Sequence, residues 1–462
     1  MDSTMLEHKS AFATEPIGRL IAKFAIPCVI SLLVNSLYNI VDQIFIGWGV
    51  GYLGNGATNV VFPITIIALA LSLMIGDGGA AYLSLKLGEG DIASARRGVG
   101  NAITMVVIVS ILLAAVFLSF INPILNLFGA TDALRPYAPE YGYVIGIGLP
   151  FMMIPAALNS TIRADGSPRY AMLSMILGAV INTIFDPLFI FVFHMGVRGA
   201  AIATVMGQVA SFIFSVVYMP RFKTLRFDAD AFRPALRTCT SILTFGISSF
   251  ITQFAITIVM ALTNNLLADY GALSVYGAEI PLTATGIVMK VNQILISILV
   301  GISVGAQPII GFNYGAKNFM RVKKALDIAL VASEVISIIA FLIFQFAPMS
   351  VVSLFGAEDD LYNEFAVMAF RTFLLLCPLT GFQTVIAVYL QAVGKPVKSA
   401  LLSLSRQIIF FVPAALILPM FLGVVGVLWT GPVADGLAFV FLVVLLAYER
   451  RQLHRISQAR QA

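Results

Sequence analysis

Long runs of apolar residues, separated by short polar segments, fill the sequence from residue 24 onward. A helix that crosses a lipid bilayer needs about 20 consecutive, mostly apolar residues. The pattern therefore predicts twelve membrane-spanning helices and leaves almost nothing for a soluble domain. The expected spans are 24–47, 57–85, 99–121, 137–161, 168–193, 197–219, 241–267, 280–307, 325–346, 363–392, 396–419 and 423–447.

The amino-acid composition supports a membrane protein and excludes several other classes. Of the 462 residues, 59% are hydrophobic and 11% are charged, whereas soluble domains contain about 25% charged residues. This argues against a cytosolic enzyme, a nucleic-acid binder and a secreted disulfide scaffold. The three cysteines and three histidines are too scattered for a disulfide framework or a metal cluster. The expected fold class is an all-α integral membrane protein.

The basic residues gather on one side of the predicted membrane. Of the 28 Lys and Arg residues, all but five fall in segments facing that side. The exceptions are Arg135 and Arg198 on the other side, and Lys290, Arg371 and Arg406 inside spans. The positive-inside rule then places both termini and the 220–240 loop in the cytoplasm, as expected for a multi-pass protein of the plasma (inner) membrane. The polar N-terminal stretch has no apolar core or cleavage site, so we expect no signal peptide.

Short motifs recur with a nearly constant spacing along the chain. Leu-Phe-Gly-Ala at 127–130 returns at 354–357, and the Gly-x-Pro of 166–168 returns at 394–396. An offset that spans six helices starts both copies on the same side of the membrane, so the copies are parallel repeats. We therefore predict two six-helix lobes, related by a pseudo-two-fold axis along the membrane normal.

Such lobes enclose a central cavity, which suits alternating access better than a continuous channel, although a channel can be built in the same way. The predicted organisation is an N-terminal lobe at 1–219, a cytoplasmic linker at 220–240, a C-terminal lobe at 241–450 and a cytoplasmic tail at 451–462.

Two acids inside the first half of the chain are the strongest functional candidates. A carboxylate in the middle of a spanning helix costs about 2.5–3.5 kcal/mol on insertion scales, so its presence needs a reason. Asn35, Asn39 and Asp42 share one face of the first span, and Asn182 lies one turn before Asp186 in the fifth. Counted from the outer helix ends at ~1.5 Å per residue, both acids lie roughly 8–10 Å deep.

Other groups are expected at the same depth. Thr204 lies about seven residues into the sixth span, and Pro187 leaves the Thr183 carbonyl without its helical donor. Carboxylate, amide, hydroxyl and carbonyl oxygens together suit a hard cation. The alternative is that these groups only hydrogen-bond helices together, which is the better explanation for Asn35 or Thr204 alone.

Three segments resemble the multidrug and toxic compound extrusion (MATE) family, in its MepA-like branch. They are Asn-Ser-Leu-Tyr-Asn-Ile-Val-Asp-Gln-Ile-Phe-Ile-Gly at 35–47, Arg-Ala-Asp-Gly-Ser-Pro at 163–168, and Gln-Pro-Ile-Ile-Gly-Phe-Asn-Tyr-Gly-Ala-Lys at 307–317. The resemblance covers about residues 16–450. It implies a twelve-helix, two-lobe antiporter, not an enzyme, that exports organic cations in exchange for Na⁺ or H⁺, as a monomer and without an organic cofactor.

The resemblance also implies roles for particular residues. Asp42, Asn182, Asp186 and Thr204 match the family's cation site, where Na⁺ is a candidate ligand, and Asn39 is assigned to it as well. Asn35, Tyr38 and Gln253 are assigned to the substrate cavity, and Pro27 matches the proline that bends the first helix. The tenth span carries no acid, which argues against a second cation site of the kind found in part of the family.

Two other functions stay open. A flippase-like exporter of a lipid-linked or amphipathic metabolite would need several basic residues to hold phosphate, and only three lie inside spans. A membrane-embedded enzyme is the remaining alternative, but the usual catalytic motifs are missing from the sequence. Glu140, Asp77, Lys86 and Glu279 lie near predicted helix ends, and we expect these four to reach the interface.

Overall fold

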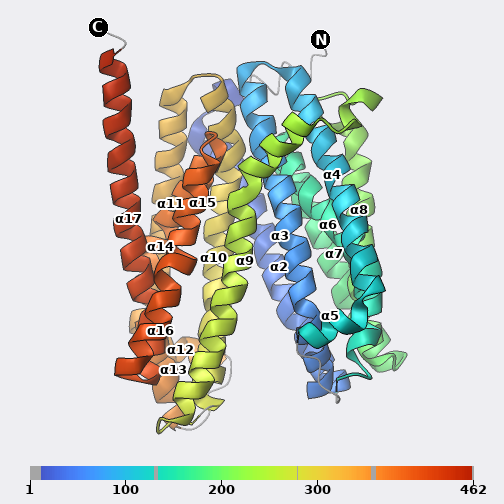
Figure 1. The fold of residues 1–462 in the computed structure, drawn as a ribbon, viewed down its shortest axis with the longest axis vertical. Coiled ribbons are helices and arrows are strands. Elements are labelled where there is room, and N and C mark those ends of the chain that lie inside the picture. The colour runs from blue at the N-terminus through green and yellow to red at the C-terminus, as the bar shows by residue number, and fades with distance from the viewer. Residues whose placement is uncertain (1–11, 129–133, 278, 355–359, 460–462) are drawn as a thin grey trace. The chain divides into compact units, whose positions relative to one another are not determined.

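The structure is a computed structural model and describes residues 12–128, 134–277, 279–354 and 360–459. Within these residues the chain is helical and contains no strand (Figure 1). The α-helices are α2 (Ile17–Val50), α3 (Tyr52–Glu89), α4 (Ile92–Ser119), α5 (Ile121–Leu127), α6 (Ala138–Ala164), α7 (Pro168–Pro187), α8 (Gly196–Tyr218), α9 (Leu236–Ala272), α10 (Glu279–Gly315), α11 (Phe319–Phe346), α12 (Pro348–Leu354), α13 (Asp360–Phe373), α14 (Cys377–Ala392), α15 (Pro396–Leu404), α16 (Phe411–Leu422) and α17 (Val424–Ala459). The π-helices η1 (Leu188–Val192) and η4 (Ser405–Phe410) and the 3₁₀-helices η2 (Met219–Arg221) and η3 (Ala229–Phe232) complete the set.

The predicted membrane spans are confirmed. Eleven helical stretches in the described residues are long and apolar enough to cross a bilayer, and α13 with α14 forms a twelfth, bent by 46°. The bend has a local cause, because Pro378 has no N–H for the Leu374 carbonyl and its ring obstructs a continuous helix. The sequence predicts a single span at 363–392, and the structure differs from it by this break. Several helices also run several residues beyond the predicted apolar spans, because hydropathy marks only the part of a helix that suits lipid.

The internal repeat is visible in the helices themselves. The short helices α5, which begins at Ile121, and α12, which begins at Pro348, both contain seven residues. Likewise α4 and α11, which begin at Ile92 and Phe319, contain 28 residues each. Both pairs of helices keep the spacing of the Leu-Phe-Gly-Ala motif, although the motif itself lies partly outside the described residues.

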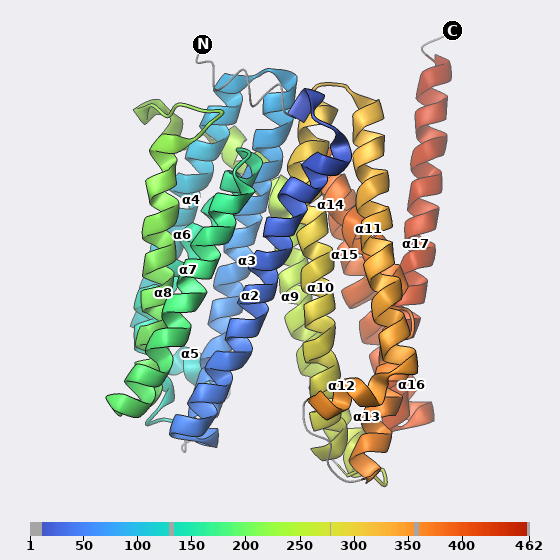
Figure 2. The same ribbon diagram turned by 180° about the vertical axis from the view of Figure 1, so that it is seen from behind.

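Contacts divide the chain into two compact units. The first comprises Met1–Phe254, Val300–Ala329 and Val388–Val397, and the second comprises Ala255–Leu299, Leu330–Ala387 and Lys398–Ala462. In the first unit α3 packs on α6, α6 and α7 pack on α8, and α2 packs along α7 (Figure 2). The lobe boundaries expected from the repeat are a different kind of division and remain a prediction.

Glycines permit some of the closest helix contacts in the first unit. A Cβ added at Gly246 of α9 would lie 1.7 Å from the Met74 carbonyl oxygen of α3. A Cβ at Gly78 would lie 2.1 Å from the Ile242 carbonyl oxygen, so the two backbones touch from both sides. Close approach of this kind is how small residues strengthen helix association in lipid, where no hydrophobic effect drives it.

The segment after α8 is fixed by two buried polar side chains. Asn101 of α4 donates to the carbonyls of Ala231 and Arg233 at 3.0 and 3.1 Å and accepts from the Ala235 N–H at 2.7 Å. Asp165, which is fully buried, accepts four hydrogen bonds, from the Tyr218 hydroxyl, the Lys223 N–H, and the N–H and hydroxyl of Thr224. The predicted linker is therefore attached to the first unit rather than hanging free.

Candidate functional site

Four of the predicted residues meet in the first unit. The Asn182 amide nitrogen donates to Asp186 Oδ1 at 3.3 Å and to Thr204 Oγ1 at 3.1 Å, which joins α7 to α8. Asp42 of α2 lies within side-chain hydrogen-bonding range of both Asp186 and Asn182. Asp42, Asn182 and Asp186 are 8%, 2% and 0% exposed. The expectation that the two acids approach each other is confirmed. We refer to Asp42, Asn182, Asp186 and Thr204 as the acid cluster.

The acid cluster has more acceptors than donors. Asp42 Oδ1, Asn182 Oδ1 and Asp186 Oδ2 are buried and receive no hydrogen bond from the protein. A buried acceptor that loses its water without gaining a donor costs about 1–3 kcal/mol, and more when it is charged. The Oγ1 of Thr204, which accepts from the Asn182 amide nitrogen, is a fourth oxygen of the cluster. The donor set therefore fits a proton or a small hard cation such as Na⁺.

Local sequence explains how α7 and α8 come close enough to form the cluster. A Cβ on Gly207 would lie 2.4 Å from the Gly178 carbonyl oxygen, so only glycine fits at this crossing. One turn beyond Gly178 lies Asn182. Directly after Asp186, Pro187 ends α7, and the chain continues as the π-helix η1. Short π-helical segments inside longer helices occur frequently at functional sites.

Three further residues lie beside the acid cluster, of which one was predicted from the sequence and two were not. Tyr38, a predicted cavity residue, lies within electrostatic range of Asp42 and Asp186. Tyr141 of α6, which is 8% exposed, lies within range of the same two acids and was not predicted. Gln43 was also missed; its side chain lies within hydrogen-bonding range of Asp42, and its amide nitrogen donates to Thr58 of α3 at 3.4 Å. Adjacency to Asp42 was an available signal for Gln43, whereas Tyr141 is brought in only by packing.

The remaining predicted residues lie outside these contacts. Asn39 is exposed, and its amide nitrogen donates to the Asn35 carbonyl at 2.7 Å within α2. Asn35 is exposed as well, and Gln253 is half-buried on α9. Pro27 is buried inside α2, where its carbonyl accepts from the Ser31 hydroxyl at 2.7 Å. Their roles in substrate binding and bending stay predictions.

The expectation for Asp77 is wrong. Its side chain is 13% exposed and does not reach an interface; it accepts from the Ser160 hydroxyl at 2.7 Å and from the Ser249 hydroxyl at 2.9 Å. Arg163 lies 3.8 Å away. Asp77 is well before the end of α3, because that helix runs past the predicted span to Glu89. The acid therefore joins α3, α6 and α9.

Two of the basic residues inside predicted spans find partners in the second unit. Arg406 Nε donates to Asp435 Oδ1 at 2.5 Å. Arg371 Nε donates to the Gln345 carbonyl at 3.1 Å, and the Gln345 amide returns a bond to the Arg371 carbonyl. Lys290 is exposed. Sequence could not supply the two pairings, since each joins residues on different helices.

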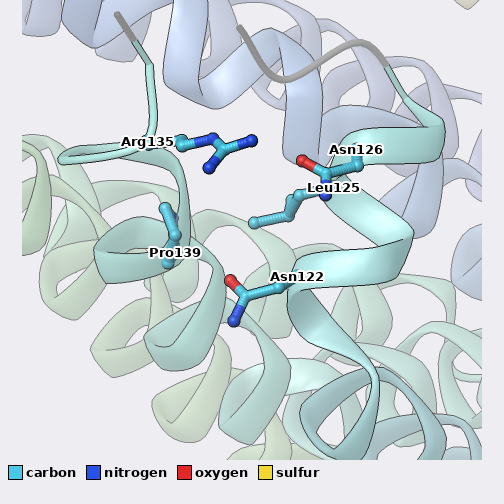
Figure 3. A pocket seen from close by; sticks show the side chains of 5 residues that line it. All are labelled: Asn122, Leu125, Asn126, Arg135 and Pro139. Atoms are coloured by element: carbon cyan, nitrogen blue, oxygen red, sulfur yellow. The ribbon is translucent and has the colours of Figure 1, made fainter. Parts of the chain in front are cut away.

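A cavity of about 370 Å³ lies apart from the acid cluster. It is bounded by α5 and the start of α6, and the Arg135 side chain reaches across it (Figure 3). None of the predicted site residues lines it, so we do not assign the candidate site to this cavity. Its lining residues are Asn122, Leu125, Asn126, Arg135 and Pro139.

Comparison with known proteins identifies the family. The MatE family model matches residues 27–188 and 248–417, which cover most of the chain and include Asp42, Asn182 and Asp186. The chain belongs to the MatE family. It is therefore a multi-pass membrane transporter and not an enzyme, and the resemblance found in the sequence is confirmed.

Relatives and solved structures agree with the MatE assignment. The multidrug export protein MepA of Staphylococcus haemolyticus is 25% identical over 458 residues, with 97% of each chain covered. An FAD transporter of Shewanella oneidensis is 24% identical, covering 95% of this chain and 96% of that one. The structure of a multidrug resistance MATE family transporter in an outward-facing conformation matches with a TM-score of 0.88 at 23% identity, covering 99% of both chains. The two-lobe, all-α fold is thereby confirmed.

Proposed function

We propose that this MatE transporter is a multidrug efflux antiporter that exports organic cations by alternating access in exchange for H⁺ or Na⁺. The observation that carries the proposal is the acid cluster, in which two buried acids and an amide present three oxygens without donors. A proton or Na⁺ supplies what those oxygens lack. The similarity to multidrug export proteins supports the substrate class.

The geometry suggests how ion binding is coupled to transport. Asp42 and Asp186 lie close together and away from water, so two negative charges there repel each other strongly. Entry of one proton or one Na⁺ removes that repulsion and satisfies the unbonded oxygens. The site then differs in charge between its loaded and unloaded states, and an organic cation is bound more weakly when the ion is present. That difference is what exchange of ion for substrate requires.

The expected setting follows the distribution of charge. With the basic segments on the cytoplasmic side, both termini face the cytoplasm of a plasma (inner) membrane, and the acid cluster lies toward the outer surface. We propose that the protein acts as a monomer with no organic cofactor. The lobes at 1–219 and 241–450, joined by the 220–240 linker, are the proposed moving parts.

Export of a lipid-linked or amphipathic metabolite is the second candidate function. The FAD transporter among the relatives is the observation that favours such an anionic substrate. Phosphate groups need unneutralised basic residues. Arg406 is paired with Asp435, and Arg371 is tied to Gln345. The ion pair with Asp435 neutralises one of the three basic residues inside spans, which favours cationic cargo.

The deciding experiment is transport by purified protein in liposomes under an imposed pH or Na⁺ gradient. Ethidium is the cationic probe, and a lipid phosphate is the competing probe. Asp42→Asn and Asp186→Asn should each reduce ion-driven ethidium export to the rate of protein-free liposomes, while Asp269→Asn, at an exposed acid of α9, should leave it unchanged. Ion-driven export retained by both cluster variants, or transport of the lipid phosphate alone, would overturn the proposal.

A further inference from the structure

Asp435 in the second unit has a counter-ion within the protein. It lies inside the span Val424–Leu446, and Arg406 lies inside the span Pro396–Leu422. The Nε–Oδ1 distance is 2.5 Å, and the Arg406 and Asp435 side chains are 25% and 5% exposed. Removing either partner of such a pair leaves an uncompensated charge in a medium that solvates it poorly.

This setting is the opposite of the acid cluster. In the cluster, Asp42 Oδ1 and Asp186 Oδ2 have no donor, so their charge requires a cation from outside the protein. Asp435 Oδ1 receives a charged donor from Arg406. One acid site therefore has oxygens that lack a donor and need an external cation, and the other already contains a cation that cannot leave.

The two sites lie on related elements of the repeat. The span that begins with α7 at Pro168 contains the π-helix η1, and the span that begins with α15 at Pro396, the matching proline of the second copy, contains the π-helix η4. Asp186 lies just before η1, whereas Arg406 lies within η4. The element that presents an acid in the first half thus presents a base in the second.

Gln383 contacts the backbone of Asp435. The Gln383 amide nitrogen donates to the Asp435 carbonyl at 3.1 Å, while Gln383 Oε1 is buried without a donor. Gln383 is 6% exposed. The other titratable groups nearby are Cys377, whose thiol is within electrostatic range of Asp435, and Glu334, which is in range of that thiol.

We propose that Arg406 acts as a tethered cation that occupies the place of a coupling ion at Asp435. With Arg406 present, the second unit takes up no ion, and coupling rests on the acid cluster alone, a statement that depends on the proposed function. Without the guanidinium, the Asp435 carboxylate becomes a second site for a monovalent cation, which is a proton or Na⁺. Arg406 is thus a residue that sets how many ions one transport cycle uses.

The test is made in full-length protein that lacks the first site. Asp42→Asn/Asp186→Asn protein is examined for equilibrium binding of radioactive Na⁺ and, separately, for proton uptake in an unbuffered titration. This background should take up neither ion at these sites. Adding Arg406→Gln should restore uptake of about one monovalent cation per chain, because an isolated buried carboxylate must gain a counter-ion or a proton. Further addition of Asp435→Asn should abolish that uptake.

Controls separate the proposal from its alternatives. Arg371→Gln, at another basic residue of the second unit, and Arg406→Lys, which keeps a cation, should add no uptake. If Arg406→Gln does not fold, Arg406→His gives the same information, since a histidine is charged below about pH 6.5 and neutral above it. Na⁺ uptake should then appear only as the pH rises.

The results of this experiment test the tethered-cation proposal separately from the proposed transport function. Uptake that is unchanged in folded Arg406→Gln, and likewise in Arg406→His, overturns the tethered-cation proposal even if the acid cluster couples transport as proposed. An ion already bound at Asp435 with Arg406 present also overturns it. A gain of uptake that Asp435→Asn reverses supports it, whether or not the acid cluster proves to bind an ion in otherwise unaltered protein.

Discussion

Three buried aspartates differ in the groups that surround them, and this difference separates their roles. Asp186 keeps an oxygen without a donor, Asp435 is bonded to a guanidinium, and Asp165 accepts four hydrogen bonds. A donor deficit indicates a site for a mobile ion, a tethered charge excludes one, and a full set of neutral donors indicates a structural anchor. Residue type and burial alone would have treated the three as equivalent.

At the residue scale, two aspartates outside the spans should make the free energy of unfolding depend on pH with opposite signs. Burial raises the pKa of Asp165 above its ordinary value of 3.8, although hydrogen bonds from Thr224, Lys223 and Tyr218 oppose the shift. The folded protein then holds this proton where the unfolded chain has lost it. The resulting stability is fully present below pH 3.8 and is lost as the pH rises through the raised pKa.

The half-buried Asp91, the N-cap residue of α4, provides the comparison. The Ser94 N–H lowers the pKa of Asp91, so its stabilising effect is present above pH 3.8 and is lost as the pH falls through the lowered pKa. The test is thermal unfolding followed from about pH 3 to pH 7. In the unaltered protein, Asp165 makes stability fall as the pH rises, and Asp165→Asn should abolish that fall. Asp91 makes stability rise with pH, and Asp91→Asn should abolish that rise. Slopes that change in the same direction in both variants would contradict this assignment.

At the element scale, the crossing of α3 and α9 depends on Gly246. An added Cβ would overlap the Met74 carbonyl, which is backbone and cannot rotate away. Gly246→Val should therefore lower the unfolding free energy by about 3 kcal/mol, the upper end of the usual cost of overpacking. Gly286→Val is the matched control, because no atom lies within 4 Å of a Cβ there. Equal melting temperatures for the two variants would show that this contact is not tight.

The first spanning helix supplies a second prediction at this scale. Pro27 deprives the Lys23 carbonyl of its helical hydrogen bond, and such a helix bends at low cost. We expect Pro27→Ala to fold, to slow transport and to weaken the mutual antagonism between ion and substrate. The alternative is a fixed kink that only fits α2 to its neighbours. Pro63→Ala, at a proline inside α3, is the control. Unchanged affinities and transport rate in Pro27→Ala would support the fixed kink.

At the scale of the whole molecule, the sign of the substrate decides what can drive export. A cation that moves inward down the membrane potential releases ~2.3 kcal/mol of free energy per 100 mV per charge. Exchange of one such ion for one monovalent organic cation, however, moves no net charge. A pH or Na⁺ gradient without voltage should therefore drive export of a monovalent dye, and voltage without either gradient should not. Liposomes with potassium and valinomycin to set the voltage make the measurement. Strong transport driven by voltage alone would show that more than one ion moves per cycle.

The spans, the repeat and the central pair of the acid cluster could all be predicted from the sequence. Each rests on a signal that is local in the chain: bilayer thickness sets the length of an apolar run, a duplicated half repeats its turns, and an acid is conspicuous in an apolar helix. Asp42 and Asp186 could be brought together because depth follows from counting along each helix. The break before Pro378 was also readable and was missed.

Which polar groups meet could be read from the packing of the helices and not from the sequence. Arg406 and Asp435 are 29 residues apart, and Asp77 and Ser249 are 172 apart. Such pairings depend on how each helix is rotated about its axis and how closely its backbone approaches a neighbour, and glycines on partner helices set that distance. Hydropathy fixes the depth of a side chain but not the helix it faces. For that reason the sequence indicated an ion site in the first half of the chain but not the arginine that neutralises an acid in the second.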